Sequence, residues 1–114
     1  MSDNALQDKA DELAIAVVKV NEELCAKRKF SLADQLLRSG TSVGANISEA
    51  SFAHSRADFI SKMQIAGKEC CETKYWLRIL RLSGVYENEV LESLVESIRR
   101  MLAASVKTAK QHAS

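Results

Sequence analysis

The sequence of 114 residues contains no proline and only four glycines. These two residue types most often interrupt helices, so their scarcity predicts a chain that is nearly all helical. Apolar residues make up 46% of the chain and charged residues 27%, which is an ordinary balance for a globular domain. Because this length can enclose one modest core, we expect a single domain over residues 1–114.

Long apolar runs are also missing. No stretch approaches the roughly 20 apolar residues that a membrane-spanning helix needs. The first residues, Met1 to Asn4, lack the basic and apolar regions of a secretory signal. We therefore expect a cytoplasmic protein with no membrane partner.

The sequence lacks the common patterns of catalytic and metal sites. Cys25, Cys70 and Cys71 form no C-x-x-C pair, and we interpret them as small buried hydrophobic residues in a reducing compartment. A di-iron bundle needs E-x-x-H motifs on two helices, whereas Glu49 and His54 are five residues apart. There is no phosphate-binding loop and no nucleophile motif. The sequence therefore predicts a protein that is not an enzyme and has no cofactor or metal.

Apolar residues recur with helical spacing in four segments, at about residues 5–27, 32–54, 56–82 and 87–110. Ser31 is the predicted N-cap of the second helix, whose inward stripe extends to His54, and Gly84 is the predicted stop after the third. The inward residues expected in the fourth helix are Leu91, Leu94, Ile98, Met101 and Ser105. Because the connections are short, the fold class predicted is all-α, an antiparallel up-down-up-down four-helix bundle.

Two of the predicted helices have sequence features that a simple four-helix bundle does not require. Gly40 and Gly44 lie one turn apart in the second helix, which favours close approach of a neighbouring helix. The third helix is apolar on a second side, about 120° from its core stripe at 100° per residue. That side contains Ile65, Glu69, Glu72, Trp76 and Ile79. We interpret it as a subunit interface; the alternative is that this helix is simply the most buried one of a monomer.

The glutamates of the middle helices, Glu49, Glu69 and Glu72, require partners if they are partly buried. Arg38, Arg56 and Arg78 are the candidates, together with groups on a facing subunit.

Basic residues gather where the first and third helices end. This predicted rim consists of Lys27, Arg28, Lys29, Arg78 and Arg81, and Lys107 and Lys110 end the fourth helix at the opposite pole, near Arg56. One interpretation is that these cations only complement the helix macrodipoles. The other is a phosphate-binding rim, repeated in an oligomer, that contacts the nucleic-acid backbone. With one Trp, two Tyr and three Phe, base stacking is not expected to dominate.

Two stretches resemble a known family. Residues 36–50, LLRSGTSVGANISEA, resemble the R-x-S-x-S-x-x-A-N-I-x-E-G signature of bacterial four helix bundle proteins, also called 23S rRNA intervening-sequence proteins. Residues 58–66, DFISKMQIA, resemble the start of that family's third helix, and residues 69–77, ECCETKYWL, resemble its E-x-x-E-T-x-Y-W-L ending. In this chain Ala50 stands where the family usually has glycine.

The resemblance implies an antiparallel four-helix bundle that assembles into a barrel-like homopentamer. Some members of the family are encoded inside insertions of the large ribosomal RNA gene, and a related branch is the nucleic-acid-binding accessory protein of diversity-generating retroelements. That branch is markedly basic, whereas this chain has a net charge of +1. The family has no known catalytic residues. By resemblance, the motif residues Asn46, Glu49, Glu69, Glu72, Tyr75 and Trp76 have structural roles at helix and subunit contacts.

Together these features predict a non-enzymatic homo-oligomer, a pentamer by resemblance, that binds RNA or DNA or acts as an accessory protein. The alternative is an adaptor that recruits another protein and does not bind nucleic acid.

Overall fold

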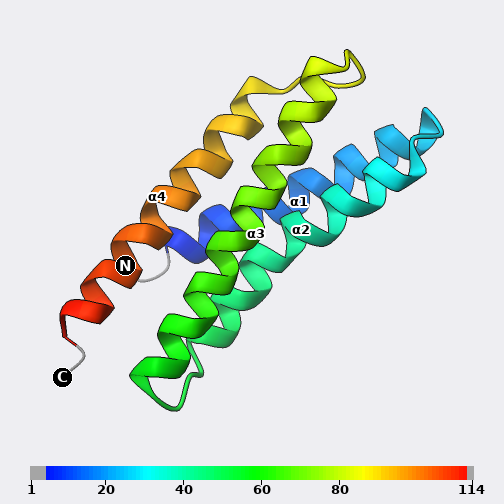
Figure 1. Ribbon diagram of the computed structural model, residues 1–114. Helices are drawn as coiled ribbons and strands as arrows, with labels where there is room; N and C mark the ends of the chain where they lie inside the picture. Colours follow the sequence, from blue (N-terminus) through cyan, green and yellow to red (C-terminus); the bar gives the residue numbers. More distant parts are fainter. Residues whose placement is uncertain (1–4, 113–114) are drawn as a thin grey trace.

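The computed structural model describes residues 5–112, and four helices make up most of this part of the chain (Figure 1). The helices are α1 (Ala5–Ala26), α2 (Phe30–Ala50), α3 (Arg56–Leu82) and α4 (Glu89–Gln111). Except at the end of α2, each bound lies within two residues of its predicted position. The prediction about Met1 to Asn4 lies outside the described residues.

Consecutive helices run side by side in opposite directions, which confirms the predicted antiparallel bundle (Figure 1). α1 packs on α2, α2 on α3 and α3 on α4, and a smaller contact between α1 and α4 closes the bundle. The connections at residues 27–29 and 83–88 lie at one end of the molecule, which we call the double-turn end. The connection at residues 51–55 lies at the other end.

The core residues of α1 and α3 recur with the expected helical spacing, and Leu13, Val17 and Leu77 among them are almost fully buried. In α4 the predicted stripe is off by one residue. The buried residues there are Leu91, Val95, Ile98, Leu102 and Ala109. Of the predicted set, Leu94, Met101 and Ser105 are only half-buried. Apolar residues stand next to each other at 94–95 and 101–102, so the spacing alone fits either alignment.

The predicted second helix is too long at its C-terminal end. α2 ends at Ala50, and His54 lies beyond it in the connection with a side chain that is 86% exposed. The physical reason is the start of α3. Ser55 has an extended backbone, and its hydroxyl oxygen accepts a hydrogen bond from the Asp58 N–H at 3.0 Å. This N-cap requires the chain to leave the α2 helix before Ser55.

The predicted N-cap of α2 is also wrong. Ser31 lies inside the first turn, and Lys29 is the cap position without a side-chain hydrogen bond. α2 begins early because α1 ends abruptly in a Schellman motif. The Lys29 N–H bonds to the Leu24 carbonyl at 2.9 Å and the Arg28 N–H to the Cys25 carbonyl at 2.9 Å.

The two glycines of α2 lie against a neighbouring helix, as predicted, and the structure shows that this helix is α1. A Cβ atom on Gly40 would lie 2.8 Å from Cγ1 of Val17, so only glycine allows α1 and α2 to approach this closely. At Gly44 the fit is looser, and the side-chain amide of Gln7 donates to the Gly44 carbonyl at 3.2 Å.

Candidate nucleic-acid and subunit interfaces

The double-turn end brings together the predicted basic rim. Lys27, Arg28 and Lys29 follow α1, and Arg78 and Arg81 lie in the last turns of α3, whose C-terminal end points the same way (Figure 1). The five residues therefore lie at the same end of the bundle, as predicted. Binding by these residues stays a prediction.

Two of the five rim cations are already engaged within the chain. The Lys27 ammonium donates to the Val85 carbonyl at 2.8 Å, which ties the two connections together. The Arg81 guanidinium donates to the Glu92 carboxylate at 3.0 Å, and this hydrogen bond raises the pKa of Arg81. Glu87 and Glu89 also contribute negative charge near Arg81. The α3–α4 side of the rim is thus of mixed sign.

The other three rim cations, Arg28, Lys29 and Arg78, are exposed and form no ion pair within residues 5–112. The Arg28 guanidinium lies 5.7 Å from the centre of the half-exposed Phe30 ring. These three cations are therefore available for contacts outside the chain.

Arg28 has an unusual backbone conformation for an arginine. Its φ is +62°, and it is the only residue besides glycine with a positive φ in the described chain. α3 ends at the same pole in the same way, with Gly84 at φ +74° and the Val85 N–H bonded to the Leu80 carbonyl at 3.0 Å. Gly84, the predicted stop after the third helix, indeed follows the end of α3 in a left-handed conformation. At the equivalent position after α1, the chain has a cation where glycine would be less strained.

The predicted second face of α3 is largely used within the chain. Arg38 of α2 contacts both carboxylates, with Nη1 at 3.4 Å from Glu69 and Nη2 against Glu72. The Trp76 indole N–H donates to Glu72 at 3.0 Å. These two hydrogen bonds, led by that from Arg38, lower the pKa of Glu72. Of the arginines considered from the sequence, Arg38 is the partner of both glutamates.

The remaining members of this face differ in exposure. Trp76 is half-buried against the core, and Ile79 is half-buried. Tyr75 is half-exposed and lies edge-on to Trp76, with 5.3 Å between ring centres. Ile65 is 39% exposed. The alternative of a well-buried helix thus accounts for much of the pattern, and the subunit interface stays a prediction.

Two further motif residues have local roles. The Asn46 side chain donates to the Ser42 carbonyl at 2.8 Å, one turn earlier in α2. Glu49 pairs with Lys62 of α3 at 2.8 Å, not with one of the arginines expected from the sequence. Lys62 lies on the flank of α3 that faces α2, a position that the core stripe of α3 could have identified.

The cysteines confirm the expected burial only in part. Cys70 is fully buried, and burial raises the pKa of its thiol to about 12. Cys25 is half-buried and Cys71 is exposed. Within residues 5–112, no three His, Cys, Asp or Glu side chains are grouped so as to hold a metal ion. Nor is any helix of this part long and apolar enough to cross a membrane.

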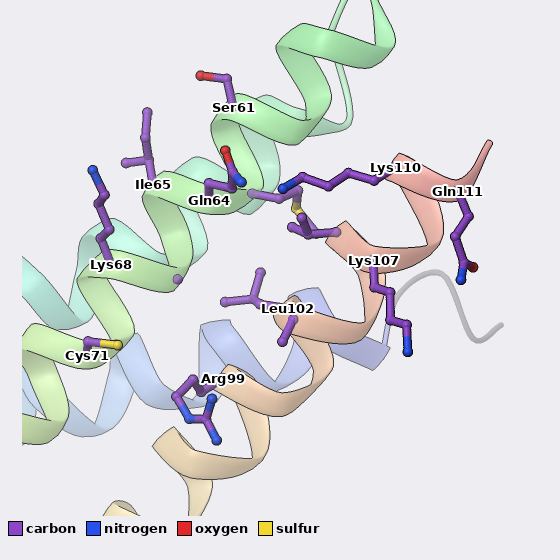
Figure 2. A pocket seen from close by; sticks show the side chains of 14 residues that line it. Ser61, Gln64, Ile65, Lys68, Cys71, Arg99, Leu102, Lys107, Lys110 and Gln111 are labelled. Carbon is purple, nitrogen blue, oxygen red and sulfur yellow. The ribbon is translucent and has the colours of Figure 1, made fainter. Parts of the chain in front are cut away.

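A groove that the sequence analysis missed runs between the first half of α3 and the second half of α4 (Figure 2). Its volume is about 960 Å³. Apolar groups from Ile65, Leu102 and Val106 line it, and the surrounding cations are Lys68, Arg99, Lys107 and Lys110. No Asp or Glu lines this groove. The signal in the sequence was Gly67, a glycine inside the third helix that leaves α3 without a side chain at the groove.

Comparison with known proteins gives one family and one solved structure of note. The family model for 23S rRNA-intervening sequence protein matches residues 2–105. A crystal structure at 1.70 Å of a Bacteroides thetaiotaomicron protein of unknown function, from the S23 ribosomal protein family, superimposes with a TM-score of 0.89. The two sequences are 41% identical, and the match covers 94% of this chain and 99% of the other. No curated protein matches.

Proposed function

Since this chain belongs to the 23S rRNA-intervening sequence protein family, we propose that it is a non-enzymatic homo-oligomer that binds nucleic acid through its double-turn end. The resemblance stated above suggests five subunits. Arg28, Lys29 and Arg78 contact phosphates, while Lys27 and Arg81 mainly hold the two connections in place. The binding is directed at the backbone and tolerant of sequence, because few aromatic side chains are free to stack on bases.

The conformation of Arg28 is the observation that carries this proposal. A left-handed backbone costs a non-glycine residue roughly 1–2 kcal/mol. The equivalent turn at the same pole uses Gly84 and avoids this cost. Strain that a simple substitution would relieve points to a use for the side chain that is present. Here that side chain is an exposed cation beside Lys29 on a protruding turn.

Assembly strengthens this interpretation. Three free cations in one subunit form a weak site, but a symmetric oligomer presents the same cations several times. Binding of one phosphate group then raises the effective concentration of the next, so a modest basic surface reaches useful affinity. A net charge of +1 per chain does not oppose this, because the field near a surface depends on the local arrangement of charge.

The test is a titration of labelled structured RNA and duplex DNA from low to physiological salt. We compare the wild type with Arg28→Glu/Lys29→Glu and with a control of equal charge change, Lys9→Glu/Arg100→Glu. We expect the rim variant to lose binding and the control to keep most of it. In the wild type, the slope of log affinity against log salt gives about 0.7–0.9 per phosphate neutralised. No wild-type binding at low salt contradicts the proposal, and so does equal loss in both variants.

The alternative function is a protein scaffold that recruits another chain without binding nucleic acid. The α3–α4 groove favours it, because an apolar floor contributes nothing to phosphate binding and is typical of protein contacts. The same titration separates the two functions, since a scaffold shows no salt-dependent binding of RNA or DNA.

A further inference from the structure

The α3–α4 groove has an apolar centre and basic ends. Leu102 and Val106 of α4 line it between the cations, and Ile65 lines its edge on α3. Lys107 and Lys110 lie toward the end of α4, and Lys68 lies one turn beyond Ile65 on α3. Figure 2 shows Lys110 reaching from α4 toward Gln64 of α3. None of these three lysines forms an ion pair within the described residues.

The groove is open because α3 has a glycine at its floor. A Cβ atom built on Gly67 meets nothing within 4 Å, in contrast to Gly40, whose Cβ would collide with Val17. Glycine inside a helix costs roughly 0.5–1 kcal/mol relative to alanine, and no contact within the subunit explains that cost at Gly67. Space over the α3 backbone is what this glycine provides.

The outer face of α1 has the complementary character. Ile15 is 60% exposed and Val18 is 45% exposed, and both lie on the side of α1 opposite its core stripe. At 100° per residue, the exposed acids Asp8, Asp11 and Glu12 lie on the same side before them, and Glu22 lies on it after them. This outer face is apolar at its centre and acidic at both ends, with Lys19 its one basic residue.

The two surfaces also match in length. Residues 8–22 of α1 span about 21 Å at 1.5 Å per residue. Residues 99–111 of α4, which form one wall of the groove, span about 18 Å. Apolar centre and charged ends therefore fall at similar spacing on both surfaces, with opposite sign at the ends.

We propose that the outer face of α1 in one copy of this chain docks into the α3–α4 groove of the next copy. Ile15 and Val18 occupy the space above Gly67, and the acids of α1 pair with Lys68, Lys107 and Lys110. The contact joins two different surfaces, so it repeats head to tail and generates a ring when the rotation closes. This inference rests on the homo-oligomer proposed above and names its two surfaces.

The test uses one variant for each surface. Ile15→Asp/Val18→Asp places two more acids on the α1 face, and Gly67→Trp fills the groove. Both sites are open in the single chain, so we expect each variant to keep its helical circular dichroism. By sedimentation or native mass, each variant alone should fall to a monomer while the wild type stays an oligomer.

Matched controls accompany both variants. Leu82→Asp/Val90→Asp makes the same chemical change at two exposed apolar residues away from either surface. Gly67→Ala adds one methyl group and leaves most of the groove open. Both controls should keep the wild-type mass.

The decisive experiment mixes the two variants, each of which has one of the two surfaces disrupted. The α1-face variant still has an intact groove, and the groove variant still has an intact α1 face. A head-to-tail contact therefore predicts a 1:1 heterodimer at high concentration that grows no further. If both variants keep the wild-type mass, or if the mixture stays monomeric, the proposed surfaces are wrong. A monomeric wild type overturns both this contact and the proposed homo-oligomer.

Discussion

At the scale of single residues, the most informative comparison lies between Arg28 and Gly84. Both complete a Schellman motif at the end of a long helix and both have a positive φ. The sequence favours this conformation at Gly84 because glycine adopts a positive φ without steric cost. It does not predict it at Arg28, since only the packing of α1 against α2 requires the chain to reverse there.

We expect Arg28→Gly to be more stable than Arg28→Ala by about 1 kcal/mol, because only glycine avoids the left-handed strain. Both variants lose the guanidinium and its contact with Phe30, so their difference isolates the backbone contribution. Urea unfolding midpoints at neutral pH measure it. Equal midpoints would remove the strain on which the proposed function depends.

A second residue-scale prediction concerns the buried hydroxyl groups of Thr73 and Ser39. Both residues are fully buried, and the Thr73 hydroxyl oxygen lies 2.9 Å from that of Ser39 and 2.8 Å from the Glu69 carbonyl. We expect Thr73→Val to cost about 1 kcal/mol, since it leaves Ser39 with a poorer set of partners. Adding Ser39→Ala should recover part of that loss. A double-mutant cycle from urea unfolding checks this, and strictly additive losses would contradict it.

At the scale of helices, the sequence predicts that the four helices exist, but it does not predict which side of each helix is buried or exactly where each helix ends. The four helices follow from apolar spacing and from the absence of proline. The one-residue shift in α4 was not predictable, because neighbouring apolar residues fit two alignments. The early end of α2 depends on the Ser55 cap of the next helix, and the groove depends on two helices at once.

Two glycines in the middle of helices lead to opposite predictions. Gly67→Ala should raise the free energy of unfolding by about 0.5–1 kcal/mol, because the added methyl group meets nothing. Gly40→Ala should lower it by about 1–3 kcal/mol, since the new Cβ would lie 2.8 Å from Val17 and α1 must shift. Thermal and urea unfolding measured at low protein concentration give both values. If both substitutions changed the free energy of unfolding in the same direction, the helix packing around one of the two glycines would differ from that described.

At the scale of the whole molecule, the bundle is joined by charged contacts that run between helices. Arg38 of α2 contacts Glu69 and Glu72 of α3. Glu96 of α4 accepts from Lys74 of α3 at 2.8 Å and also contacts Arg99 and Arg100. The sequence could indicate that the glutamates need partners, but their pairing depends on which helix faces lie side by side.

These ion pairs make the free energy of unfolding depend on pH in the acid range. The pKa values of Glu72 and Glu96 both lie below the ordinary value of 4.5, chiefly because Arg38 and Arg99 donate hydrogen bonds to them. A carboxylate with a lowered pKa in the folded state stabilises the fold above the unfolded pKa, and the contribution is lost as pH falls through the folded pKa. The urea midpoint should therefore be flat near neutral pH and fall below about pH 4.5. Glu72→Gln/Glu96→Gln should lower the midpoint at pH 7 and flatten its fall toward pH 3, whereas Asp34→Asn on the exposed side of α2 should leave the profile unchanged. An unchanged slope in the double variant would show that other carboxylates control the acid response.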